Sequence, residues 1–129
     1  MNTTIKLQKI KGSFSVCKIT NANEADFTRE FVFITKTPDE ISLVCESDCV
    51  PTTATAVEHG WKAFRVSGIL DFGLIGILSK IAGILAKEKI SIFAVSTYNT
   101  DYVLVKTENF DAGMEALIRN GYAVDTEAA

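Results

Sequence analysis

The chain has 129 residues, and its 13 Lys and Arg against 16 Asp and Glu give a formal net charge of −3. Hydrophobic residues make up 47% and charged residues 22%, a balance typical of folded globular proteins that excludes disordered and collagen-like classes. The negative charge provides no general attraction to nucleic acid. One His and three Cys leave few residues for metal or catalytic-triad chemistry, so composition favours a binding module over an enzyme.

No targeting or membrane segment is expected. The first ten residues lack the apolar core of a signal peptide. The most apolar stretch, residues 67–85, is interrupted by Asp71, Lys80 and four glycines, which a membrane span of about 20 residues rarely tolerates. We therefore expect a cytoplasmic protein without membrane contact.

The cysteines Cys17, Cys45 and Cys49 are odd in number and follow no CxxC spacing. This pattern predicts reduced thiols, buried or on edge strands. Cys45 and Cys49 with His59 form only a loose set of metal ligands, so no metal site is expected, and His59 is interpreted as a surface or linker residue.

The first half of the chain reads as strands with very little helix. Residues 14–16 form a strand, residues 31–44 alternate as a hairpin, and residues 52–57 read as a closing strand. Residues 23–27 and 47–50 leave room for no more than a helical turn each.

The second half contains a complete set of elements. A strand over 61–68 precedes a helix over about 74–88, and a hairpin over 92–105 precedes a helix over about 108–119 and a strand over 122–124. Thr107 is the expected N-cap of the second helix, and Asn120-Gly121 its stop. The expected inner faces of the two helices are Leu74, Ile77, Leu78, Ile81, Ile84 and Leu85, then Phe110, Met114, Leu117 and Ile118.

The two hairpins look like an internal repeat. Ile34 falls on Val95 and Leu43 on Leu104 at an offset of 61 residues, although chance similarity between alternating hairpins is the alternative. The order βαββαβ predicts an α+β fold of two tandem ferredoxin-like units, the first with shortened helices. The expected boundaries are residues 1–59 and 60–129.

The loop before the first long helix is one candidate binding segment. Gly73 and Gly76 near a helix start cost up to about 1 kcal/mol each relative to Ala. They indicate either close approach of the backbone to an anionic ligand at the helix N-terminus or tight packing of helix on sheet, with Asp71 as a cap.

The hairpin tip, residues 96–101, is the other candidate segment. In a βαββαβ unit it lies near the start of the first helix. Hydroxyls of Ser96, Thr97 and Thr100 and the carboxylate of Asp101 would then converge beside the helix N–H groups, a pairing that suits a zwitterionic amino acid. A solvated polar turn is the alternative.

Other chemistry finds little support. Neither GxGxxG nor G-K-[ST] is present, so no cofactor is expected, and no nucleophile or acid–base pair is evident. The strand at 102–107 lacks the aromatic pattern of RNA-binding ferredoxin-like domains, and the first-helix loop lacks the Arg of an acylphosphatase-type phosphate loop.

The sequence resembles the ACT-domain superfamily of amino-acid-binding regulatory modules. The resemblance rests on residues 68–78 and 90–105, with 38–44 and Gly60-Trp61 in support, and covers nearly the whole chain. It is to the tandem ACT pairs of aspartate kinase and, more closely, to small bacterial tandem-ACT proteins and the CASTOR-type arginine sensors of animals.

The resemblance implies a regulatory protein without enzymatic activity that binds a small ligand, an amino acid, and forms a homodimer. Leu74 replaces an acidic residue of the arginine sensors, so their specificity does not carry over. The alternative is a protein-interaction module with a decayed or empty pocket, its partner enzyme unidentified. The implied ligand contacts are Asp71, Gly73, Leu74, Ile75, Gly76, Ile77, Thr97, Thr100 and Asp101.

Overall fold

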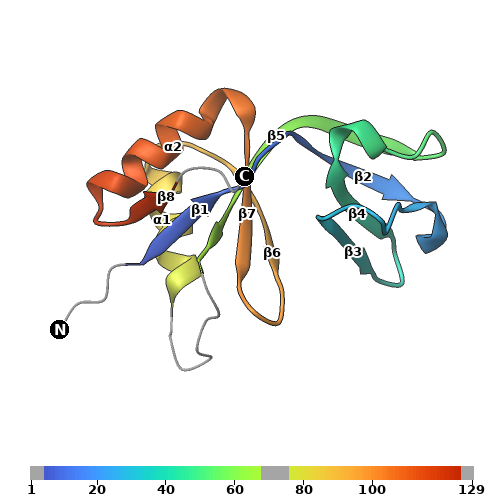
Figure 1. Cartoon of the computed structure of the whole chain (residues 1–129), viewed down its shortest axis with the longest axis horizontal. Coiled ribbons are helices and arrows are strands. Elements are labelled where there is room, and N and C mark those ends of the chain that lie inside the picture. Colours follow the sequence, from blue (N-terminus) through green and yellow to red (C-terminus); the bar gives the residue numbers. More distant parts are fainter. Residues whose placement is uncertain (1–4, 68–75, 126–129) are drawn as a thin grey trace. The chain divides into compact units, whose positions relative to one another are not determined.

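A computed structural model describes residues 5–67 and 76–125. Within them the chain is a mixed α+β protein with two α-helices and eight strands, shown in Figure 1. It divides into two compact units: unit 1 comprises Met1–Lys11 and Lys62–Ala129, and unit 2 comprises Gly12–Trp61. None of the helices in the described part is both long and apolar enough for a membrane crossing.

Unit 2 is a small antiparallel sheet with two short turns of 3-10 helix. Its strands are β2 (Phe14–Ile19), β3 (Val32–Lys36), β4 (Ile41–Glu46) and the first part of β5 (Ala56–Val66), in the spatial order β3-β4-β2-β5. The helical turns are η1 (Ala22–Glu24) and η2 (Ser47–Cys49), which confirms the prediction that both helix positions are reduced to one turn. Cys17, Ile19, Ala25, Leu43 and Cys45 form its small core.

Unit 1 contains both long helices. Its elements are β1 (Lys6–Lys9), the end of β5, α1 (Ile77–Lys87), β6 (Ile92–Ser96), β7 (Asp101–Lys106), α2 (Thr107–Arg119) and β8 (Ala123–Asp125). Helix α1 contacts α2, and its buried residues Ile81 and Leu85 share one core with Phe64 and Val66 of β5 and with Phe110 and Leu117 of α2.

Strand β1 sits inside the sheet of unit 1. Leu7 pairs antiparallel with Val66 of β5, and on its other edge it pairs in parallel with Val124 of β8. The observed order is thus β8-β1-β5 and then β7-β6. The predicted boundary groups residues 6–9 with the first half, whereas the structure groups them with the second, because β1 pairs with β5 and β8.

The predicted helix ends need small corrections. Helix α2 begins at Thr107 with Lys106 in the N-cap position, so Thr107 is not the cap. Asn120 is the C-cap and Gly121 follows with φ +95°, which confirms the predicted stop. Ile118 is 52% exposed and does not belong to the inner face of the helix.

The two hairpins correspond at an offset of 60 residues. Ile34 pairs with Leu43, and Ala94 pairs with Val103, so the predicted offset of 61 is wrong by one position. A shift of one residue along a strand exchanges the two faces of the sheet. The runs Leu43–Cys45 and Val103–Val105 are apolar and buried at every position, so the sequence alone does not distinguish neighbouring offsets.

Candidate functional site

The turn between β6 and β7 is closed mainly by two threonines. The backbone N–H of Thr97 donates to the carbonyl oxygen of Thr100 at 2.8 Å. The Oγ1 hydroxyl of Thr97 also donates to this oxygen at 2.9 Å and accepts from the N–H of Thr100 at 3.3 Å. The predicted ligand hydroxyl of Thr97 is therefore engaged within the turn itself.

Thr100 fixes the turn to the neighbouring strand. Its side chain is only 6% exposed, and its Oγ1 donates to the carbonyl oxygen of Val66 at 2.8 Å. Val66 is the last residue of β5, two positions before the predicted binding loop begins. The hairpin tip thus lies at the strand end that leads into this loop, and the Thr100 hydroxyl acts as an anchor.

Asp101 lies at the base of the turn, opposite Ser96. The two residues are cross-strand partners, and the Ser96 hydroxyl donates to Oδ1 of Asp101 at 2.6 Å. Ser96 is exposed and Asp101 half-buried. The hydrogen bond orients the carboxylate at the surface of unit 1.

The start of α1 is the second part of the predicted site. Gly76 occupies the N-cap position in the left-handed region, at φ +78° and ψ +13°, and among the described residues no side chain makes a capping hydrogen bond to the helix. Its carbonyl oxygen accepts from the N–H of Lys80 at 2.9 Å, while Ile77 packs against the core. An uncapped helix start presents N–H groups and the positive end of the helix dipole.

The structure thus describes five of the nine predicted site residues. Thr97, Thr100 and Asp101 share one hairpin tip, while Gly76 and Ile77 form the start of α1. Both segments lie toward the lower side of unit 1 in the view of Figure 1. The other predicted residues, Asp71, Gly73, Leu74 and Ile75, lie outside the described residues.

Unit 2 contains a polar cluster that sequence reasoning missed. Ser15 is fully buried, and its Oγ lies 2.8 Å from Nδ1 of His59 and 2.9 Å from Oγ of Ser47. The register of β2 against β5 shifts between Phe14 and Val16. No motif links these positions in the sequence, and only strand pairing brings them together.

The three cysteines are free thiols, as predicted. Burial raises the pKa of Cys17 and of Cys45, which keeps both thiols protonated and unreactive. Cys49 is half-buried and donates to the carbonyl oxygen of Glu46 at 3.2 Å. Across residues 5–67 and 76–125, no group of three or more His, Cys, Asp or Glu is arranged to hold a metal ion.

Comparison with known proteins connects this geometry to a family. A family model described as the ACT domain matches residues 56–119, and a second, for the N-terminal domain of a group of related proteins, matches residues 12–53. Fold and matches together define an α+β protein built around an ACT domain. The chain belongs to the ACT-domain superfamily.

Among curated proteins, the cytosolic arginine sensor for mTORC1 subunit 1 of Homo sapiens and that of Bos taurus are each 38% identical over 60 residues. The matched segment covers 46% of this chain and 18% of each sensor, so the chain corresponds to a small part of these relatives.

Among solved structures, a protein of Agrobacterium tumefaciens is 30% identical with a TM-score of 0.87, covering 99% of this chain and 97% of that one. Aspartate kinase of Clostridium acetobutylicum, described as an allosteric enzyme, is 17% identical with a TM-score of 0.63, covering 86% of this chain and 33% of the kinase. At this identity the kinase supports the fold alone.

Proposed function

We propose that this protein is a non-enzymatic cytoplasmic sensor that binds an amino acid at unit 1, between the hairpin tip and the start of α1. The observation that carries the proposal is the Asp101 carboxylate, which Ser96 orients at 2.6 Å beside the hairpin turn. A carboxylate in this position suits the ammonium group of an amino acid.

The uncapped start of α1 supplies the complementary half of the site. Its first N–H groups and the helix dipole favour an anion such as the α-carboxylate of the ligand. Backbone N–H groups of Gly76 and Ile77 would bind this carboxylate, with the predicted loop residues Asp71, Gly73, Leu74 and Ile75 completing the pocket.

The proposal includes two ACT-like units, of which only unit 1 binds ligand. The turn of unit 2 closes in the same way, with the N–H of Thr37 donating to the carbonyl oxygen of Glu40 at 2.9 Å. At the offset of 60 residues, Lys36 and Ile41 stand where unit 1 has Ser96 and Asp101. The position equivalent to Asp101 therefore carries no carboxylate in unit 2.

The relatives support a regulatory role. One is named an arginine sensor, and we propose a small amino acid as the ligand class here without carrying over arginine, because Leu74 is apolar. We further propose that the protein forms a homodimer, because two-fold homodimers are the commonest assemblies of soluble proteins.

Isothermal titration against the twenty amino acids tests this function. We expect at least one amino acid to bind, and the Asp101→Asn variant to lose this binding while it stays folded. The Asp39→Asn variant, which removes the same charge from the turn of unit 2, is the matched control and should bind normally. Absence of heat with every amino acid contradicts the proposal.

A protein-interaction module with an empty pocket is the second candidate. The observation that favours it is that the hydroxyls of Thr97 and Thr100 are both engaged within the protein. In this case a partner captured by the protein would be bound equally well with and without each amino acid, and Asp101→Asn would leave the capture unchanged.

A further inference from the structure

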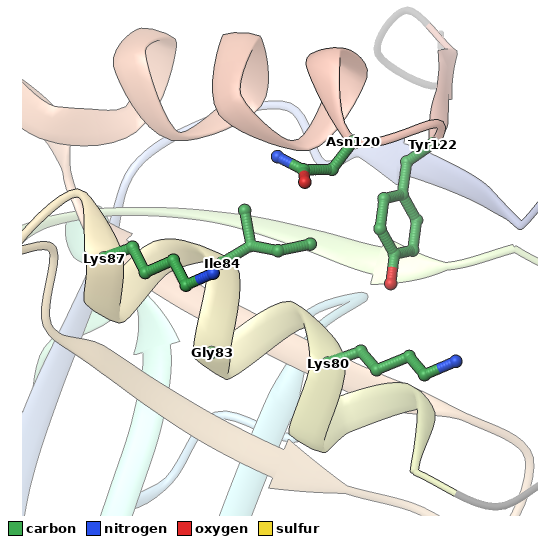
Figure 2. A pocket seen from close by; sticks show the side chains of 6 residues that line it. All are labelled: Lys80, Gly83, Ile84, Lys87, Asn120 and Tyr122. Atoms are coloured by element: carbon green, nitrogen blue, oxygen red, sulfur yellow. The ribbon is translucent and has the colours of Figure 1, made fainter.

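A groove lies across helix α1 of unit 1. It has a volume of about 310 Å³ and runs between α1 and the segment that follows α2, as Figure 2 shows. Four of its lining residues come from α1 and two from the segment that follows α2. The lining residues are Lys80, Gly83, Ile84, Lys87, Asn120 and Tyr122.

The groove is positively charged, although the protein is negative overall. Lys80 and Lys87 are the only charged residues of α1, and both line the groove. Neither forms an ion pair with a carboxylate in the described part of the chain. They are seven positions apart, about 10 Å along a helix. The two lysines therefore lie at opposite ends of the groove, with Gly83 and Ile84 between them.

Gly83 allows a ligand to approach the backbone of α1 closely within the groove. A glycine inside a helix costs about 0.5–1 kcal/mol relative to Ala, and a Cβ at Gly83 would meet no atom of residues 5–67 or 76–125 within 4 Å. Gly113 of α2 differs, because its Cβ would lie 3.2 Å from Cδ2 of Leu85. Packing therefore explains Gly113 but not Gly83.

The opposite wall supplies an aromatic ring and fixed polar groups. Nδ2 of Asn120 donates to the carbonyl oxygen of Ala116 at 2.8 Å, and Figure 2 shows the amide oxygen turned toward α1. The Tyr122 ring points from the segment between α2 and β8 toward α1 in the same view. Burial raises the pKa of Tyr122, so its hydroxyl remains a neutral hydrogen-bond donor.

We propose that this groove binds a planar aromatic anion, at a site separate from the amino-acid site. The flat body of the ligand lies over Gly83 and Ile84 against the Tyr122 ring, and Lys80 and Lys87 bind the anionic group. The volume of about 310 Å³ fits a small molecule.

Two sources of this chemistry are distinguished by titration of the full chain. The probes are adenosine 5′-monophosphate for a nucleotide and indole-3-acetate for an aromatic carboxylate, with adenosine and inorganic phosphate as controls. We expect at least one of the two anions to bind at least tenfold more tightly than both controls, and binding to weaken with salt. Equal binding of a control, or absence of binding by both anions, overturns the proposal.

Variants tie the binding to the groove. We expect Gly83→Ala and Lys87→Gln each to weaken binding of the anion about tenfold. Lys36→Gln removes the same charge from strand β3 and should leave binding unchanged, as should Asp101→Asn, which tests the amino-acid site separately. Unchanged binding in both Gly83→Ala and Lys87→Gln overturns the assignment to this groove.

Discussion

Thr100 joins the tip of the β6–β7 hairpin to the end of β5, because its buried Oγ1 donates to the carbonyl oxygen of Val66 at 2.8 Å. The hydrogen bond connects two segments that are 34 residues apart in the chain. It places the Asp101 side chain, which we propose contacts the ligand, near the end of β5. The predicted binding loop follows β5 in the chain.

Loss of this hydrogen bond should destabilise the protein. Thr100→Val keeps the shape of the side chain but leaves the Val66 carbonyl oxygen without its donor, which costs about 1–3 kcal/mol when the group is buried. Urea unfolding followed by circular dichroism measures the change. Thr97→Val, in an exposed turn, is the control and should cost less; an equal cost for both contradicts the anchoring role.

The two helix glycines should respond in opposite directions to alanine. Gly83→Ala should raise the free energy of unfolding by about 0.5–1 kcal/mol, since the new methyl group meets open space. Gly113→Ala should lower it by about 1 kcal/mol, because Leu85 is fully buried and cannot readily move away from the new Cβ. Thermal unfolding of both variants provides the comparison. Stabilisation by Gly113→Ala would contradict the prediction, because it would show that Leu85 moves to accommodate the new methyl group.

Unit 2 should lose stability at acid pH through Glu24. The Thr53 hydroxyl, and after it donors from Asn21 and Thr20, hold the pKa of this carboxyl below its ordinary value of 4.5. A lowered folded-state pKa stabilises the fold above pH 4.5, and this contribution is lost as the pH falls through the folded-state value.

The single tryptophan, Trp61, provides the fluorescence signal for this test. We expect wild type to exceed Glu24→Gln in stability at pH 6 and the difference to shrink steadily toward pH 3. The Glu30→Gln variant removes another acidic group of unit 2 and is the control. A difference that stays constant across this range would mean that the Glu24 carboxylate contributes no pH dependence.

The buried thiols should resist alkylation in the native protein. Because burial raises the pKa of Cys17 and Cys45, we expect iodoacetamide at pH 7.5 to modify them only as the protein unfolds. Half-buried Cys49 should react first, and all three should react in urea. Mass spectrometry of the labelled peptides resolves the order, and rapid native labelling of Cys45 would contradict its burial.

Strong local periodicity made several elements predictable from the sequence. Phe110, Met114 and Leu117 recur at helical spacing and lie buried in α2, and Asn120-Gly121 ends this helix as expected. The reduced helices of the first half and the free cysteines followed equally from local residue patterns. These features depend on neighbours within a few positions, which a sequence displays directly.

Register and the direction of side chains could not be obtained in this way. The runs Leu43–Cys45 and Val103–Val105 are apolar at every position, so offsets of 60 and 61 match equally well in the sequence. The equivalence of the hairpins therefore needed the observed pairing of Ala94 with Val103. The hydroxyls of Thr97 and Thr100 were predicted to face a ligand, yet both bond within the protein. The acceptor of each threonine hydroxyl depends on how the strands pair, so it is known only from the folded structure.

The α+β class, the two hairpins, both long helices and the ACT-type character of the chain can be recognised from the residues alone, because each rests on local periodicity or on a contiguous motif. Three relationships required the folded structure: β1 lies between β5 and β8, Ser15 lies beside His59, and Lys80 and Lys87 border a groove with Tyr122. These relationships join residues far apart in the chain, and pairing and packing energies over the whole fold select them.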